Sequence, residues 1–168
     1  MTSIAVRDGI MAYDSRFVDG TAISPLGLKK GWLSKRHPLF YACAGIYTTG
    51  LAISRALDRL TVLPWDDDTD ITLPDDDGET TMFALHRDGR LFCFEGGSWY
   101  LNEGPFAAIG SGADSALGAL HAGATAKQAV EISCLVDRNS GPPVCTVAAV
   151  DIPTPKQIKR PLRPRVTA

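Results

Sequence analysis

Thr2 is the residue with the clearest potential for chemistry in this sequence, because it directly follows Met1. A small residue at position 2 permits removal of Met1, which would leave Thr2 with a free α-amine. One residue would then carry both a nucleophile and its base. The hydroxyl can attack a carbonyl carbon, and the amine can take the hydroxyl proton, directly or through a water. The expected chemistry is acyl transfer to Thr2, followed by hydrolysis of the resulting ester.

A carboxylate and an ammonium group further along the chain suit this chemistry. Asp14 ends a short predicted strand, and Lys30 follows a loop rich in glycine and proline. A buried Lys30 ammonium beside Thr2 would lower the pKa of the α-amine, which is ordinarily about 8, and would stabilise a developing alkoxide. A buried ammonium needs a partner, and Asp14 supplies one.

Further polar motifs follow in a definite order. After Asp14, which opens Asp14-Ser15-Arg16, and Lys30 come Gly110-Ser111-Gly112 and then Asp137 with Ser140-Gly141. Each residue taken alone has an ordinary structural explanation: Asp14 as a turn residue, Lys30 as a solvated lysine, Ser111 as a helix N-cap and Asp137 as a helix end. Only the ordered combination favours a catalytic site.

This ordered set of motifs resembles the catalytic β-subunits of proteasomes. It also resembles, more loosely, the peptidase subunit of the bacterial two-component ATP-dependent protease. These are N-terminal-nucleophile hydrolases, so the resemblance implies an α+β fold, a four-layer αββα sandwich of two antiparallel sheets flanked by helices. It covers about residues 2 to 150 and includes the spacing between Asp14 and Lys30.

The resemblance also implies a role for each matching residue. Thr2 corresponds to the nucleophile, Lys30 to the catalytic lysine (with Lys29 as the adjacent alternative), and Asp14 to the acidic partner of that lysine. Gly45 corresponds to the glycine whose backbone N–H forms the oxyanion hole. Ser111 corresponds to the serine near the amine, and Asp137 and Ser140 to the pair that holds the N-terminus.

Substrate and partners are implied in the same way. The positions that line the pocket for the residue before the cleaved bond are Phe17, Leu28, Cys43 and Tyr47, which suggests a preference for apolar substrates. The resemblance implies a peptide or unfolded protein substrate, a homo-oligomeric ring and an ATP-dependent unfoldase as partner. It implies no cofactor and no metal.

Composition is typical of an ordinary globular protein. The chain has 168 residues, 45% hydrophobic and 21% charged, and we expect one domain over residues 2–152. The net charge of −2 argues against nucleic-acid binding, and no stretch has the length of a membrane span. Arg7 and Asp8 interrupt the region that an export signal would keep apolar, so we expect a cytoplasmic protein. The four scattered cysteines indicate buried thiols in a reducing compartment.

The pattern of apolar residues predicts the elements that would position the site. Strands are expected at 3–6, 10–13, 31–33, 39–44, 81–85, 90–95, 106–109 and 144–150, and a loop at 17–28. Helices are expected at 46–60, at 113–122 with unusually small residues, and at 125–136, where Thr125 and Gln128 form a capping box.

Two segments depart from the family pattern. Residues 64–79 are acidic and contain two prolines, so an exposed loop is expected where the family has a second helix. Calcium binding there is the less favoured alternative, because the spacing of a known calcium loop is missing. Residues 153–168 form a basic, proline-broken tail for which we expect no regular structure.

Three functions remain open from the sequence. The first is a threonine endopeptidase that works inside a ring. The second is an N-terminal-nucleophile amidohydrolase that acts on a small amide without a ring. The third is a catalytically inactive scaffold subunit that keeps the fold.

Overall fold

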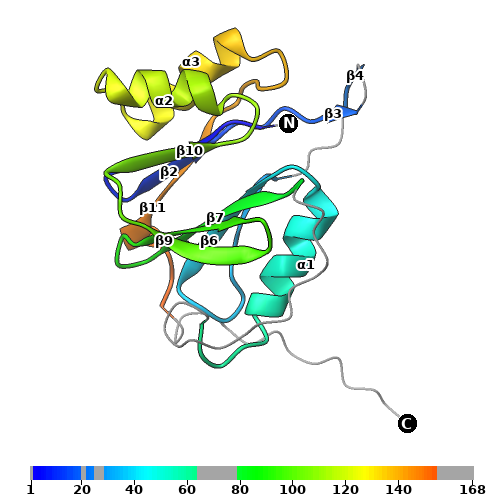
Figure 1. Cartoon of the computed structure of the whole chain (residues 1–168), viewed down its shortest axis with the longest axis vertical. Coiled ribbons are helices and arrows are strands. Elements are labelled where there is room, and N and C mark those ends of the chain that lie inside the picture. The colour runs from blue at the N-terminus through cyan, green and yellow to red at the C-terminus, as the bar shows by residue number, and fades with distance from the viewer. Residues whose placement is uncertain (1, 20–21, 25–28, 64–78, 155–168) are drawn as a thin grey trace.

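The computed structural model describes residues 2–19, 22–24, 29–63 and 79–154 (Figure 1). Most of the acidic segment, Leu28 and the tail from residue 155 lie outside this part of the chain, so the expectations for them are not tested. Within it, no helix is both long enough and apolar enough to span a membrane.

Two antiparallel sheets form the centre of the molecule. One has the strand order β10-β1-β2-β11, built from Phe106–Ile109, Ile4–Arg7, Ile10–Tyr13 and Cys145–Ala148. The other has the order β5-β6-β7-β8-β9, built from Gly31–Leu33, Leu39–Ala44, Thr81–His86, Leu91–Glu95 and Ser98–Asn102. A short ribbon of β3 (Val18–Asp19) and β4 (Ala22–Ile23) follows β2 along the chain.

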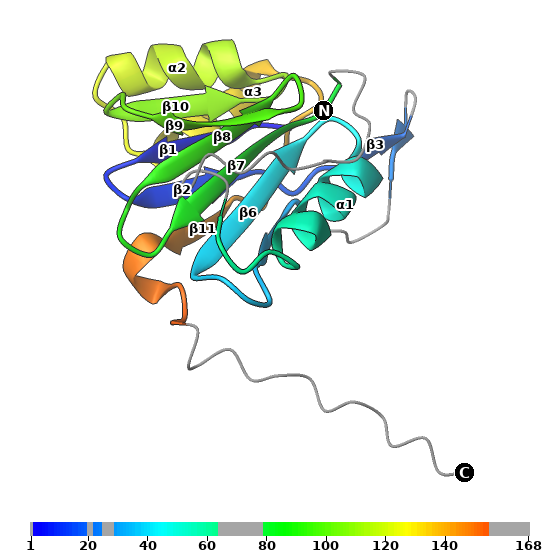
Figure 2. The same cartoon turned by 60° about the horizontal axis from the view of Figure 1, so that its bottom comes forward.

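Helices cover the outer faces of the two sheets. α2 (Ala113–His121) and α3 (Ala126–Val136) pack on the first sheet, and α1 (Tyr47–Leu57) packs on the second (Figure 2). The capping box of Thr125 and Gln128 at the start of α3 is present. The layers therefore run helices, sheet, sheet, helix, which confirms the predicted αββα sandwich.

The apolar side chains form one cluster between each pair of layers. Successive side chains of a strand point to opposite faces of the sheet, which explains this arrangement. In β1, Ile4 and Val6 face the opposite sheet, whereas Ala5 faces α2 and α3. Small residues dominate the helix side, including Ala5, Ala12, Ala116 and Ala129, all fully buried. These small side chains let α2 and α3 approach the sheet closely, as the sequence of residues 113–122 predicted. A third cluster lies between the second sheet and α1.

The structure corrects several boundaries. Ser98–Asn102 forms an edge strand that the sequence pattern did not reveal. The expected loop at 17–28 contains the short β3–β4 ribbon, and the strand expected at 144–150 ends at Ala148, where a 3-10 turn (Ala149–Asp151) begins. Of the cysteines, Cys43 and Cys93 are buried as expected, but Cys134 and Cys145 are only half-buried.

Candidate active site

Thr2 lies two residues before β1 and is buried against the loop that leads into α2. The backbone N–H of Gly112 donates to the Thr2 carbonyl oxygen at 3.3 Å. Gly110 has a φ of 96°, and a Cβ there would collide with that same oxygen and press on Ala44 at the end of β6. Glycine at position 110 therefore permits a close approach between Thr2, the loop before α2 and the end of β6.

Asp14 and Lys30 form a buried ion pair. Nζ of Lys30 lies 2.8 Å from Oδ1 of Asp14, and their side chains are 2% and 0% exposed. The backbone N–H of Ser3 donates to the same carboxylate oxygen at 2.9 Å, which ties the pair to the residue after Thr2. Burial lowers the pKa of Lys30 below its ordinary value, and the neighbouring Asp14 carboxylate opposes that shift. The ion pair is therefore in contact with Ser3, the residue that follows Thr2.

Backbone groups complete the surroundings of the Asp14 carboxylate. Its Oδ2 accepts from the N–H of Arg16 at 3.1 Å and from the N–H of Gly141 at 3.0 Å. Gly141 belongs to the loop after α3, so this carboxylate joins that loop to the end of β2. Such charge-assisted hydrogen bonds stabilise the ionised carboxylate in a buried place.

Ser111, Asp137 and Ser140 form a second hydrogen-bonded group around Thr2. The Thr2 nitrogen donates to Oγ of Ser111 at 3.2 Å, and that hydroxyl donates to Oδ2 of Asp137 at 2.6 Å. Ser140 donates to the same oxygen at 2.7 Å. Burial alone would raise the pKa of Asp137, but hydrogen bonds from Ser111, Asn139 and Ser140 outweigh it and hold the pKa below its ordinary value.

Ser111 is not the N-cap of α2. That position belongs to Gly112, and no side chain caps the helix there. The ordinary structural explanation for Ser111 is therefore wrong, and its hydroxyl is free to connect Thr2 with Asp137. A Cβ at Gly112 would collide with Oγ of Ser3, so glycine is needed on this side of Ser111 as well.

Gly45 occupies the turn between β6 and α1. Its φ is 99°, and a Cβ there would collide with the carbonyl oxygen of Glu79. The pairing of Ala44 with Thr81 brings Glu79 to this position. Because Ala44 approaches Gly110 and Thr2, Gly45 lies at the same end of the sandwich as the nucleophile candidate.

The expected pocket residues have different surroundings. Phe17 covers the Lys30 ammonium, with Nζ at 5.4 Å from the ring centroid, and Phe17 meets Tyr47 edge to face at 5.7 Å. Trp32, which the sequence did not single out, packs against Tyr47 at 5.8 Å. Cys43 is 4% exposed and lies in the apolar cluster under α1, where burial raises its pKa to about 12.

Ser3 and Ser133 are site residues that the sequence did not reveal, and Arg16 is a motif residue with no role assigned from the sequence. Ser3 contacts both Asp14 and Ser140. The guanidinium of Arg16 packs on the backbone of Gly141, where a Cβ would collide with it. Ser133, fully buried, donates to the Gly112 carbonyl at 3.0 Å and so supports the loop that carries Ser111. A single serine carries no spacing signal in the sequence, so only the contacts in the structure reveal these roles.

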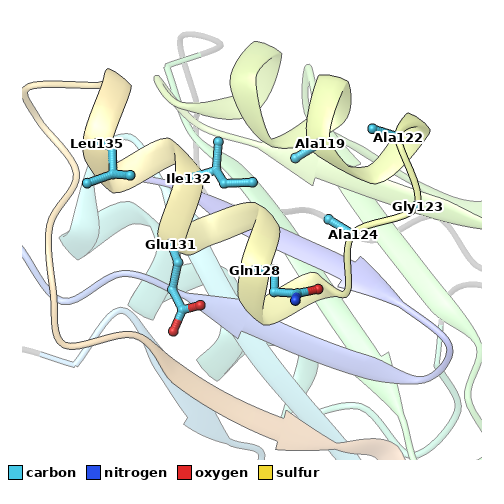
Figure 3. A pocket seen from close by; sticks show the side chains of 8 residues that line it. All are labelled: Ala119, Ala122, Gly123, Ala124, Gln128, Glu131, Ile132 and Leu135. Carbon is cyan, nitrogen blue, oxygen red and sulfur yellow. The ribbon is translucent and has the colours of Figure 1, made fainter.

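A shallow apolar groove lies elsewhere on the surface, between the end of α2 and the outer face of α3 (Figure 3). Its lining includes Ala122, Gln128, Ile132 and Leu135, none of which belongs to the groups around Thr2. Across the described ranges, no group of three or more histidine, cysteine, aspartate or glutamate side chains could hold a metal ion.

Comparisons with known proteins connect this geometry to a fold. No family model matches the sequence. No curated protein matches it either. Among solved structures, Thiobacillus denitrificans BPH is similar at a TM-score of 0.62 and 17% identity, over 87% of this chain and 95% of that one. The complex of that protein with epoxomicin is similar at a TM-score of 0.63 and 17% identity, over 87% and 96%. The chain therefore shares the fold of these two structures, in agreement with the αββα sandwich that its motifs predict.

Proposed function

We propose that this chain is an N-terminal threonine peptidase, with Thr2 as the nucleophile once Met1 has been removed. The observation that carries this proposal is the position of the Thr2 nitrogen. It donates to Ser111, which donates to Asp137, while the next residue contacts the buried Asp14–Lys30 pair. The similar structure that binds epoxomicin, a proteasome inhibitor, supports the same chemistry.

The hydrogen-bond directions suit an amine that acts as a base. The single hydroxyl hydrogen of Ser111 is committed to the Asp137 carboxylate, so Ser111 can only accept a hydrogen bond from the Thr2 nitrogen. After loss of Met1 that nitrogen is an amine. One of its N–H bonds points to Ser111, and its lone pair is left for the proton of the Thr2 hydroxyl.

Lys30 is proposed to tune this amine and the alkoxide of Thr2. A cationic neighbour disfavours the protonated amine, which increases the fraction of free base at neutral pH. Asp14 holds Lys30 in place and offsets the cost of burying its charge. Gly45 is proposed to donate its backbone N–H to the oxyanion of the tetrahedral intermediate; one such donor typically contributes about 3 kcal/mol.

The reaction would proceed through an ester on Thr2. The hydroxyl oxygen adds to the peptide carbonyl carbon, and the amine takes the hydroxyl proton. The amine then gives this proton to the leaving nitrogen as the peptide C–N bond breaks. A water molecule next attacks the ester carbonyl while the amine accepts one of its protons; the bond between the acyl carbon and Oγ of Thr2 then breaks, and the amine returns the proton to that oxygen. No cofactor is required for these steps.

For substrate and assembly we retain the expectations from the motifs. The apolar surroundings of Phe17 and Tyr47 support a peptide or unfolded protein cleaved after apolar residues. A homo-oligomeric ring, an ATP-dependent unfoldase partner and a cytoplasmic location are further parts of the proposal. Size-exclusion chromatography with light scattering tests the ring, because a monomer could not enclose a chamber.

The experiment that tests the function combines mass with turnover. The intact mass of the purified chain shows whether Met1 has been removed. Hydrolysis of short fluorogenic peptides with apolar residues is then compared between the mature chain, Thr2→Ser and Thr2→Ala. We expect Thr2→Ser to retain measurable turnover and Thr2→Ala to lose it. Turnover that survives in Thr2→Ala would rule out Thr2 as the nucleophile.

Epoxomicin provides an independent probe of the same residue. We expect the mature chain to gain the mass of one inhibitor molecule, and peptide mapping to place it on Thr2. Thr2→Ala and a chain acetylated at its N-terminus are the matched controls, because each removes one of the two reactive groups. Equal labelling of either control would contradict the proposal, and an unlabelled, inactive mature chain would favour the scaffold function.

A further inference from the structure

We propose that Ser3 is a positioning residue, whose hydroxyl donates to Ser140 and thereby strengthens the hydrogen bond of Ser140 to Asp137, the carboxylate that holds Ser111 as an acceptor toward Thr2. This inference deepens the proposed function and rests on it. It assigns a role to a residue that neither the motifs nor the resemblance singled out.

Ser3 connects the two carboxylates of the site. Its backbone N–H donates to Oδ1 of Asp14, the oxygen that also binds Lys30. Its hydroxyl oxygen lies 2.7 Å from the hydroxyl oxygen of Ser140. Its carbonyl accepts from the N–H of Asp14 at 3.1 Å. Ser3 is fully buried, so these bonds are shielded from bulk solvent.

The number of hydroxyl hydrogens decides the direction of the bond between Ser3 and Ser140. Ser140 has one such hydrogen, and it points to the Asp137 carboxylate at 2.7 Å. An ionised carboxylate can only accept, and the lowered pKa of Asp137 keeps it ionised at neutral pH. Ser140 must therefore accept from Ser3, and the chain of donors runs from Ser3 through Ser140 to Asp137.

This direction has a consequence for the amine. Asp137 Oδ2 receives two short hydrogen bonds, one from Ser140 and one from Ser111. The donation from Ser3 polarises Ser140 and strengthens its bond to Asp137, because successive hydrogen bonds reinforce one another. Without that donation the hydrogen bond from Ser140 to Asp137 is weaker. Asp137 would then be less stabilised as an anion and would hold Ser111 less firmly in its acceptor orientation.

Two substitutions separate hydroxyl donation from packing. Ser3→Ala removes the hydroxyl and leaves a small void, whereas Ser3→Cys keeps roughly the shape but offers only a weak S–H donor. Both keep the backbone bond to Asp14. If the hydroxyl positions the site, both lower kcat by about tenfold with KM within about twofold, as expected for one buried hydrogen bond. If Ser3 only fills space, Ser3→Cys behaves like the unchanged chain, and the inference is overturned.

A titration gives a readout that does not depend on turnover. The pKa of the Asp137 carboxyl is followed by NMR in the mature chain and in the two variants. We expect it to rise toward its ordinary value in Ser3→Ala and Ser3→Cys, because Ser140 no longer donates as strongly. Ser34→Ala is the matched control, since Ser34 is also buried and its hydroxyl also donates to a carboxylate, that of Asp58, beside α1. It should leave kcat and the Asp137 pKa unchanged.

The outcomes keep the two proposals distinguishable. Absence of Thr2-dependent turnover in the mature chain would remove the proposed function, and the titration would still decide whether Ser3 strengthens the hydrogen bonding of Asp137. Normal turnover with an unmoved Asp137 pKa in both Ser3 variants would overturn the inference alone. Rises in the Asp137 pKa with losses of kcat in both variants would support it.

Discussion

Nζ of Lys30 and Oδ1 of Asp14 lie 2.8 Å apart, and both side chains are buried. The carboxylate also accepts from the backbone N–H groups of Ser3, Arg16 and Gly141. This one side chain therefore joins the start of β1, the end of β2 and the loop after α3. The ion pair is part of the proposed site and part of what holds the site together.

Removal of the Asp14 carboxylate should be strongly destabilising. Asp14→Ala leaves a buried ammonium and several backbone N–H groups without their acceptor, so we expect a loss of about 3 to 5 kcal/mol in the free energy of unfolding. Urea unfolding measures it. Lys127→Met is the control, because the Lys127–Glu131 pair is exposed and should contribute less than about 1 kcal/mol. Equal small losses in both variants would mean that the Asp14–Lys30 pair is solvated in solution.

Asp137 should make stability depend on pH at the acid end. Its pKa in the folded chain is lower than the ordinary value, about 3.9, so the folded state binds the proton less readily than the unfolded state. Its stabilising contribution is present above about pH 4 and is lost as pH falls through the lower, folded-state pKa. The difference in unfolding free energy between the unchanged chain and Asp137→Asn should shrink over that range. A difference that stays constant with pH would contradict this assignment.

Gly45→Ala should disturb the turn between β6 and α1 for two reasons. The φ of 99° disfavours any residue with a Cβ, and the added carbon would collide with the Glu79 carbonyl. Gly89→Ala is a matched control, since Gly89 has a φ of 96° with nothing within 4 Å of the added carbon. We expect Gly89→Ala to cost about 1 kcal/mol and Gly45→Ala distinctly more, with turnover lost only in Gly45→Ala. Equal unfolding free energies would show that the turn relaxes.

The sequence predicted the parts of the fold that alternate strongly or carry caps. The hairpin of β1 and β2 and the helix that begins after Thr125 were predicted within a residue or two. β9 was missed because Trp99, Tyr100 and Leu101 form an edge strand that is largely exposed, without the alternation of a half-buried strand. The short ribbon β3–β4 was missed because each of its strands has only two residues.

The candidate site was predictable where a charged residue or a glycine motif marks it. The pairing of Asp14 with Lys30 and the position of Ser111 beside the Thr2 nitrogen were expected, and the structure shows both contacts. Ser3 could not be found in this way. Its role depends on contacts with residues far along the chain, Asp14 and Ser140, that no local pattern encodes.

The ring of Phe17 should set the pKa of Lys30, which it covers at 5.4 Å. Two effects oppose each other: the ring excludes water, which lowers the pKa, and its π face attracts the ammonium, which raises it. Phe17→Ala admits water, so we expect the Lys30 pKa to rise toward its ordinary value, about 10.4. Phe17→Leu keeps an apolar cover without the π face, so the pKa should stay low or fall further. NMR titration of the Lys30 side-chain nitrogen distinguishes the two variants. Equal rises in both would mean that leucine does not cover Lys30, and no change in either would mean that Phe17 does not cover Lys30 in solution.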